Sequence, residues 1–282
     1  MLSYRHAFHA GNHADVLKHL VEVLVLQYLV QKEGKPLRFI DTHAGEGTYD
    51  LRKSFASKNR EFDTGISQLW QRSDLPPAVQ AYVDVVRSCN KADTLQRYPG
   101  SPAIAAHILR PEHRLQLFEL HPEDAARLQK WAGRDRRVHV AQEDGFGSLN
   151  AILPPVEKRA LVMLDPPYEV KADYATALAS LQLARKKFAT GVYALWYPLL
   201  AREEVQLLVK KLEALPVKSL LVELSVRPAA AGGMTGSGMF VINPPWQLQQ
   251  QLEGCLPWLQ SVLAEPDAAP YRLISREENG AV

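Results

Sequence analysis

Cysteine is scarce in this sequence. Its 282 residues include only two cysteines, Cys89 and Cys255, which lie far apart and outside any Cys-x-x-Cys pattern. This usage argues against a disulfide framework and against a zinc site built from thiolates. It fits a reducing compartment, and we predict a cytoplasmic location.

Long hydrophobic runs are also missing. The most apolar segment, Leu20 to Val30, is interrupted by Glu22 and Gln27 and falls short of the roughly 20 residues that span a membrane. The first 19 residues contain four histidines, an arginine, an aspartate and a lysine, in place of the basic start and apolar core of a signal peptide. We therefore expect no membrane partner.

Neither sign of charge is in large excess. The net charge is +2, and with 46% apolar and 23% charged residues the composition is that of an ordinary globular protein. The total charge therefore neither requires nor excludes a nucleic-acid partner. Two basic clusters admit either a solvated surface or phosphate contacts: Arg52, Lys53, Lys58 and Arg60, and then Arg134, Arg136 and Arg137.

The sequence does contain a regular alternation of strand and helix patterns. Predicted strands occupy residues 37–40, 114–118, 137–140, 159–164, 191–196, 219–226 and 239–242, and predicted helices occupy 12–32, 122–132, 146–152, 172–188 and 201–214. This order, with polar residues ending the early strands, predicts an α/β fold with a Rossmann-like, mostly parallel sheet. A Gly-rich loop is expected at 231–238, and disorder after about Glu265.

A Gly-x-Gly pair, Gly45 and Gly47, follows the first predicted strand. Glycines at that point let the backbone approach a ligand closely, although the pair alone is a weak signal. A nucleotide-binding fold normally places an acid about 20 residues later, at the end of the next strand. Here the first candidate, Glu119, lies 72 residues beyond Gly47. We therefore predict a helical insertion at 50–99 between core segments 1–49 and 100–282.

The stretch Asp165-Pro166-Pro167-Tyr168 directly follows the apolar strand pattern at 159–164. Two prolines cannot donate backbone hydrogen bonds, so the strand must end there in a rigid turn. In open α/β sheets, ligands bind beyond the carboxyl ends of the strands. From these four residues alone, a catalytic corner and a simple rigid turn are both open.

Taken in order, Gly45-x-Gly47, Glu119, Asp144 and Asp165-Pro166-Pro167-Tyr168 resemble the motifs of class I S-adenosylmethionine-dependent methyltransferases that act on amino groups. The whole chain resembles the bacterial RlmJ family more narrowly, through YRHAFHAGNHADVLKH, DTHAG, YPGSP, FELHP, DPPYE, ATGVYALWYP and SGMFVINPPW. That family methylates the N6 amine of adenine 2030 in 23S rRNA. The resemblance implies a Rossmann-like sheet of seven strands with the last strand antiparallel.

The resemblance also implies site residues, with S-adenosylmethionine as the cofactor. Its cofactor-contacting positions are His19, His43, Gly45, Ser101, Glu119, Asp144, Gly145 and Asp165. Asp165 would be catalytic together with Pro166 and Tyr168. Tyr4, His6, Lys18 and Tyr168 would meet the substrate. The pattern is weakest across 50–99, so it says little about how RNA docks there.

The chemistry of the reaction explains the residue types in this motif. Adenine's amine is conjugated with its ring and is a poor nucleophile. If the Asp165 carboxylate and the Pro166 carbonyl accept its protons, its lone pair can turn toward the methyl group. The base must first be flipped out, and the ring of Tyr168 would then stack on it.

A similar stretch, Asn243-Pro244-Pro245-Trp246, competes for the catalytic role. In the class I arrangement it follows the antiparallel strand, so it would lie at the sheet edge opposite the cofactor. We therefore expect it only to end a strand.

Several alternatives remain open at this point. We expect no metal, because His9 and His13 are one helical turn apart but no further ligand completes a site. Rival functions are a DNA adenine methyltransferase, which would use the same four residues, and a non-catalytic RNA-binding or ribosome-assembly protein. The expected partner is 23S rRNA, protein-free or at an early assembly stage, and the default oligomeric state is a monomer.

Overall fold

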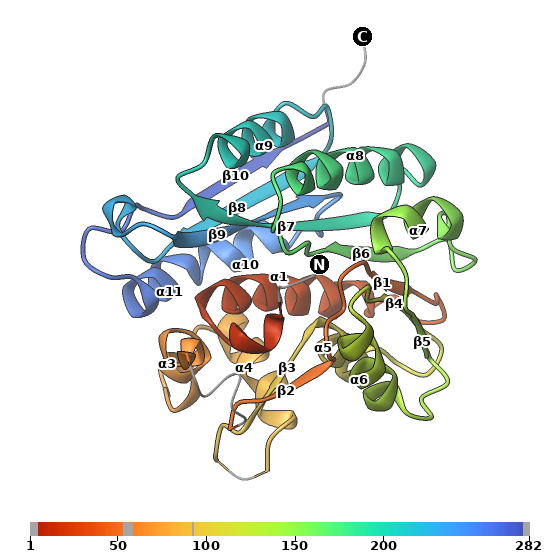
Figure 1. The fold of residues 1–282 in the computed structure, drawn as a ribbon, viewed down its shortest axis with the longest axis horizontal. Helices are drawn as coiled ribbons and strands as arrows, with labels where there is room; N and C mark the ends of the chain where they lie inside the picture. The colour runs from red at the N-terminus through yellow and green to blue at the C-terminus, as the bar shows by residue number, and fades with distance from the viewer. Residues whose placement is uncertain (1–4, 53–58, 92, 279–282) are drawn as a thin grey trace.

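A computed structural model describes residues 5–52, 59–91 and 93–278. These residues form an eight-stranded sheet in the order β10-β8-β9-β7-β6-β1-β4-β5, with helices on both faces (Figure 1). Its strands are β1 (Arg38–Asp41), β4 (Arg114–Phe118), β5 (Val138–Ala141), β6 (Ala160–Leu164), β7 (Val192–Leu200), β8 (Ser219–Ser225), β9 (Met234–Ile242) and β10 (Arg272–Arg276).

The strand directions confirm the α/β fold class. Strands β5, β4, β1, β6 and β7 are mutually parallel, and β9 is antiparallel to both β7 and β8. The carboxyl ends of the parallel strands therefore share one edge, where ligands bind in such sheets.

The seven predicted strands are present, with β9 antiparallel as expected, and the structure adds an eighth strand, β10, at the edge of the sheet. β10 lies in the stretch expected to be disordered, yet it pairs antiparallel with β8. Arg272 bonds Glu223 on β8 and Glu213 on a neighbouring helix, each at 2.7 Å. A five-residue edge strand with charged ends has little apolar signal of its own, and it is stabilised by tertiary pairing.

The predicted loop at 231–238 was also wrong in its second half, because β9 already begins at Met234. Its glycines meet close neighbours: a Cβ at Gly238 would lie 2.4 Å from the Tyr197 ring, and one at Gly236 would lie 2.2 Å from the Leu224 carbonyl oxygen. These glycines therefore allow close packing within the sheet.

Two helical layers cover the sheet and form two apolar cores. One face packs against α1 (His13–Leu29), α4 (Pro77–Ser88), α5 (Ser101–Ile108), α6 (Pro122–Ala132), α10 (Leu248–Glu253) and α11 (Leu256–Leu263). The other face packs against α7 (Gly145–Ile152), α8 (Ala172–Lys187) and α9 (Glu203–Glu213).

Helix α1 is buried along most of its length, and its polar residues are buried with it. Asn12 caps it, because its side-chain oxygen accepts hydrogen bonds from the backbone N–H groups of Ala14 and Asp15, each at 3.0 Å. Such a helix can carry charged side chains only if they find partners inside the protein. Those partners lie at the candidate site.

The segment between β1 and β4 holds a small second sheet, in which β2 (Thr48–Asp50) pairs antiparallel with β3 (Arg97–Pro99). Between these strands lie a 3₁₀ helix, η2 (Glu61–Thr64), then α3 (Ile66–Trp70) and α4. Two further 3₁₀ helices are η1 (His6–Phe8) and η3 (Ala229–Ala231). The apolar side chains of α3 and α4 belong to the same core as α1.

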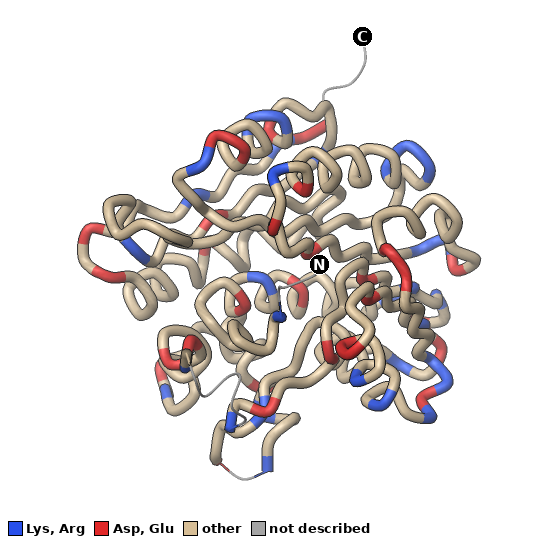
Figure 2. The backbone as a smooth tube through the Cα atoms, viewed as in Figure 1, with Lys and Arg blue, Asp and Glu red and all other residues tan. Residues whose placement is uncertain are grey.

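Charges of both signs are mixed over the view in Figure 2. Within one basic cluster, Arg137 is tied to Asp135 and to the carbonyl oxygens of Ala106 and Leu109. The Arg137 guanidinium therefore makes hydrogen bonds within the protein, which favours a structural role over contact with phosphate. Lys53 and Lys58 of the other cluster lie outside the described residues. Among the helices that the structure describes, none is long and apolar enough to cross a membrane.

Gly238→Ala is expected to destabilise the protein by about 1–3 kcal/mol, because the new methyl group would clash with the Tyr197 ring inside the sheet. Gly254→Ala is the matched control, since its Cβ would lie 3.5 Å from the nearest backbone oxygen. Urea unfolding of both variants measures the difference. Equal stabilities would show that the sheet accommodates a side chain at Gly238.

Candidate active site

A cavity of about 380 Å³ opens at the carboxyl ends of β1, β4, β5 and β6. The structure brings most of the predicted site residues together in its wall: His6, Lys18, His19, His43, Gly45, Ser101, Glu119, Asp144, Gly145, Asp165 and Pro166. Tyr4 lies outside the described residues. Tyr168 does not line the cavity.

The turn after β1 shapes one side of the cavity. Thr42 N–H donates to the Met163 carbonyl on β6, and Ala44 N–H donates to the Phe118 carbonyl on β4. These bonds hold the turn between its neighbouring strands. Gly45 has a φ of +60°, a left-handed conformation in which other residues are strained.

Glu119 follows β4 and faces the same turn. Its two carboxylate oxygens accept hydrogen bonds from the backbone N–H groups of Gly45 and His121, each at 2.8 Å. Burial raises the pKa of Glu119 above its usual value, although these two bonds favour the ionised form. The side chain keeps further lone pairs for a ligand that donates hydrogen bonds, such as a pair of hydroxyls.

Asp144 follows β5 and caps α7, because its carboxylate accepts hydrogen bonds from the backbone N–H groups of Phe146 and Gly147. The next residue must be small, since a Cβ at Gly145 would lie 2.1 Å from the Thr42 carbonyl oxygen. The cap and the close contact together fix the Asp144 carboxylate beside the turn after β1.

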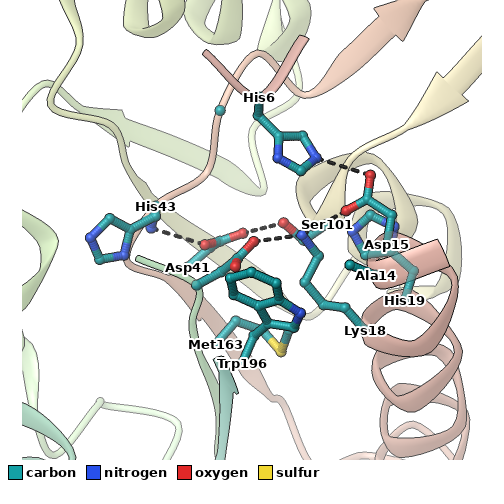
Figure 3. A network of polar contacts seen from close by, with 12 residues as sticks. His6, Ala14, Asp15, Lys18, His19, Asp41, His43, Ser101, Met163 and Trp196 are labelled. Carbon is teal, nitrogen blue, oxygen red and sulfur yellow. Dashed lines mark hydrogen bonds and ion pairs between the residues drawn. The ribbon is translucent and has the colours of Figure 1, made fainter. Parts of the chain in front are cut away.

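Asp165 follows β6 and belongs to a chain of buried charges that Figure 3 shows in part. The Lys18 ammonium group donates to Asp165 Oδ2 at 2.5 Å and lies 2.8 Å from Asp15 Oδ1. His6 Nε2 lies 2.9 Å from Asp15 Oδ2, which also accepts a hydrogen bond from Gly11 N–H. The chain thus links α1 to the end of β6 and to the N-terminal segment.

Electrostatics keep the centre of this chain ionised. Burial alone would lower the pKa of Lys18, but the adjacent Asp15 and Asp165 raise it above its ordinary value. Burial likewise opposes ionisation of Asp15, yet His6 and Lys18 hold its pKa well below the usual range. Lys18 therefore stays a cation, held by two carboxylates from different elements.

A second polar group lies under the cavity floor, around Asp41 at the end of β1. Its carboxylate accepts hydrogen bonds from Ser101 Oγ at 2.6 Å and from His43 N–H at 3.1 Å. Burial raises the pKa of Asp41 to about 7 and lowers the pKa of His43 to about 4. Glu22 is fully buried beside this group, and burial raises its pKa well above the usual value.

Tyr168 was expected to stack on the substrate base, and the structure does not bring it to the cavity. Its ring is buried against Tyr174 at a centroid distance of 4.5 Å, and its hydroxyl donates to the Trp196 carbonyl at 2.7 Å. Its backbone has a φ of +51°. The sharp turn after two prolines carries the ring into the core between the sheet and α8.

Sequence reasoning missed three residues around this cavity: Asp15, Glu22 and Asp41. Asp15 lies one helical turn before Lys18, a spacing that could have signalled the pair. Asp41 is the last residue of β1, and Glu119 and Asp165 directly follow β4 and β6. The rule that polar residues at the carboxyl ends of parallel strands lie near a ligand could therefore have identified Asp41 as well. Glu22 shows only as an acid that interrupts an apolar run.

The competing stretch after β9 lies at the opposite edge of the sheet. Ile242, at the end of β9, pairs with Tyr193 and Ser219 at the starts of β7 and β8, whereas Asp165 follows the far end of β6. The Asn243 side chain donates to the carbonyl groups of Ala189 and Gly191. These hydrogen bonds hold the turn after β9 in place, in agreement with the expectation that this stretch only ends a strand.

The histidine pair of the N-terminal region makes other contacts. His9 Nδ1 lies 2.9 Å from Glu61 Oε1, and burial lowers the pKa of His13 to about 4. In the ranges that the structure describes, no group of three or more His, Cys, Asp or Glu side chains is arranged to hold a metal ion.

Asp41→Asn should change how stability depends on pH. The folded-state pKa of Asp41, about 7, lies above its unfolded value of about 4, so wild type loses stability as pH rises between these values. The asparagine variant lacks this titration. As pH rises from about 4 to about 7, its free energy of unfolding should therefore increase relative to that of wild type by roughly 1.4 kcal/mol per pH unit. Urea unfolding of the protein alone tests this, and a stability difference that is independent of pH would contradict it.

Comparison with known proteins identifies the family. The family model described as "Ribosomal RNA large subunit methyltransferase D, RlmJ" matches residues 34–273. The chain is 48% identical over 265 residues to the ribosomal RNA large subunit methyltransferase J of Escherichia coli, covering 93% of this chain and 94% of that protein. It is 46% identical over 266 residues to the protein of the same name from Haemophilus influenzae, with the same coverage.

A solved structure agrees with the fold. The crystal structure of protein LPL1258 from Legionella pneumophila matches with a TM-score of 0.87 and 36% identity, covering 96% of this chain and 99% of that chain. The matches to these relatives cover 93–96% of this chain, and the family model spans all the cavity residues except His6, Lys18 and His19. The chain therefore belongs to the RlmJ family of ribosomal RNA large subunit methyltransferases.

Proposed function

We propose that the chain transfers a methyl group from S-adenosylmethionine to the N6 amine of an adenine in 23S rRNA, with adenine 2030 as the target. The observation that carries this proposal is the position of Asp165 and Pro166 in the wall of the cavity that also holds Glu119 and Asp144. Hydrogen-bond acceptors for an amine, on Asp165 and Pro166, and acceptors for a nucleoside, on Glu119 and Asp144, thus line the same cavity.

The cavity suits this cofactor in size and chemistry. Its volume of about 380 Å³ falls within the range of about 300–1,000 Å³ for small-molecule sites. Glu119 and Asp144 would accept hydrogen bonds from hydroxyl and amino groups, while the glycine turn lets the backbone approach the ligand. When bound, the cofactor supplies a methyl group made electrophilic by a positively charged sulfur.

Asp165 would hold the target amine. Lys18 occupies Oδ2, and among the described residues no protein group donates to Oδ1. That oxygen and the Pro166 carbonyl are two acceptors on a turn that the prolines make rigid. With both N–H bonds held, the nitrogen's lone pair leaves conjugation and can attack the methyl carbon, and Asp165 is placed to take the proton released.

The flipped base would contact groups that line the cavity. His6 and Lys18 are the described candidates, and the His6 ring lies 5.3 Å from that of Tyr49. Tyr4 is a further candidate outside the described residues. In this arrangement Tyr168 supports the turn from within the core, and stacking on the base would require its ring to leave that position.

The form of the rRNA substrate, the cellular location and the oligomeric state are also proposals. Protein-free or early-assembly rRNA offers an adenine that can still be flipped out, which favours those forms as substrate. Because ribosomal RNA is the proposed substrate, we also propose that the enzyme acts in the cytoplasm, and that it acts as a monomer. Methyl-label transfer to protein-free 23S rRNA, to an assembled subunit and to DNA separates these forms of the substrate and tests the rival DNA methyltransferase.

Asp165→Asn is expected to lower the rate of methyl transfer by about 10²–10³-fold, because the amide loses the charge and one acceptor at the point where the amine gains positive charge. Affinity for S-adenosylhomocysteine should change only a few-fold. Asp173→Asn makes the same chemical change at the cavity rim and serves as the control. Single-turnover label transfer measures the rate, and near-normal transfer by the Asp165 variant would remove this residue from the mechanism.

Glu119→Gln should act mainly on cofactor binding. An amide oxygen can replace only one of the two acceptors that bond Gly45 and His121, and its NH₂ group would face a backbone donor. We expect the dissociation constant of S-adenosylhomocysteine to rise about tenfold or more, equivalent to ~1.4 kcal/mol. Calorimetry measures it, and an unchanged constant would refute the role given to Glu119.

A further inference from the structure

Three buried polar side chains connect the cavity to the segment between β2 and β3. His19 Nδ1 lies 2.7 Å from the Tyr98 hydroxyl, which lies 2.9 Å from the Tyr82 hydroxyl. Tyr82 and Tyr98 are fully buried and His19 is 1% exposed. His19 comes from α1, Tyr82 from α4 and Tyr98 from β3, so three separate elements build this row.

The direction of the hydrogen bonds in this row follows from counting donors. Among the described residues, the Tyr82 hydroxyl has one hydrogen-bonding neighbour, Tyr98, so its proton can be accepted only there. Tyr98 then accepts from Tyr82 and must donate to His19 Nδ1. In the opposite direction, the Tyr82 proton would be buried without an acceptor, at a cost of about 1–3 kcal/mol.

Burial keeps all three groups neutral. It raises the pKa of both tyrosines above their usual values and lowers the pKa of His19 well below its own. A neutral imidazole carries one proton, so an unprotonated Nδ1 requires a protonated Nε2. His19 lines the cavity, and Nε2 is the ring nitrogen left to face it.

We propose that Tyr98 fixes the tautomer of His19 so that its Nε2–H is a hydrogen-bond donor for the carboxylate of the bound cofactor. This inference rests on the proposed function for the identity of the ligand. Tyr98 is a positioning residue, because it acts only through His19.

The neighbourhood of His19 favours an anionic group over the other parts of the cofactor. Ser101 lies in the same wall and begins α5, whose amino-terminal end carries positive partial charge. The acidic side chains Glu119 and Asp144 follow β4 and β5 and suit groups that donate hydrogen bonds. A hydrogen-bond donor at His19 Nε2, together with Ser101 and the amino-terminal end of α5, therefore makes this side of the cavity suitable for a carboxylate.

Nuclear magnetic resonance of the full chain with ¹⁵N-labelled histidine tests the tautomer directly, because protonated and unprotonated ring nitrogens have distinct shifts. His19→Gln assigns the signal. Wild type should show unprotonated Nδ1 and protonated Nε2, and Tyr98→Phe should show a mixture. Tyr82→Phe is the matched control: it removes an equally buried hydroxyl, but Tyr98 still has only His19 to donate to. A protonated Nδ1 in wild type would overturn the proposal.

Calorimetry with two ligands tests the carboxylate contact. S-adenosylhomocysteine carries the amino-acid group, and 5′-methylthioadenosine lacks it. Tyr98→Phe should weaken the first about tenfold and leave the second unchanged, while Tyr82→Phe should change neither more than about twofold. Equal weakening of both ligands, or equal effects of both variants, would refute the contact. If wild type bound neither ligand, both the proposed cofactor and the carboxylate contact would be refuted. The nuclear magnetic resonance experiment would still show which tautomer His19 adopts.

Discussion

The ion pair between Lys18 and Asp165 is the constraint on which the site depends. Both groups are largely buried, and Lys18 also needs Asp15 one helical turn away on α1. Removing Lys18 would leave the Asp15 and Asp165 carboxylates without their shared cation, at a cost of about 3–5 kcal/mol. The register of α1 against the end of β6 is therefore tied to the position of the carboxylate proposed to meet the substrate.

This arrangement also explains how one carboxylate can be both fixed and available. Lys18 takes one oxygen of Asp165 and holds its orientation, while the two prolines prevent the turn from relaxing. The second oxygen is left to the cavity. Preorganisation of this kind suits the proposed reaction, which needs alignment more than a strong base, because no group would have to move as the target amine becomes positively charged.

The sequence predicted features that follow from local rules, and it failed where distant contacts decide. Strand ends carry Glu119, Asp144 and Asp165, so a parallel sheet had to bring them to one edge. The side on which Tyr168 lies depends on a backbone turn at φ +51° and on a bond to Trp196, 28 residues away. Pairing with β8 likewise stabilises β10, whose own five residues carry little pattern.

The division into a core and an insertion at 50–99 stays a prediction, and the packing shows how closely the two are joined. Val79, Tyr82, Val83 and Val86 of α4 are fully buried in the same apolar core as α1. A domain that only carried RNA would need no such contact with the helix that bears Lys18 and His19. Tyr98 hydrogen-bonds His19, which lines the cavity, and Tyr82 hydrogen-bonds Tyr98. The segment therefore supports the cavity wall from within the core, although its own residues do not line the cavity.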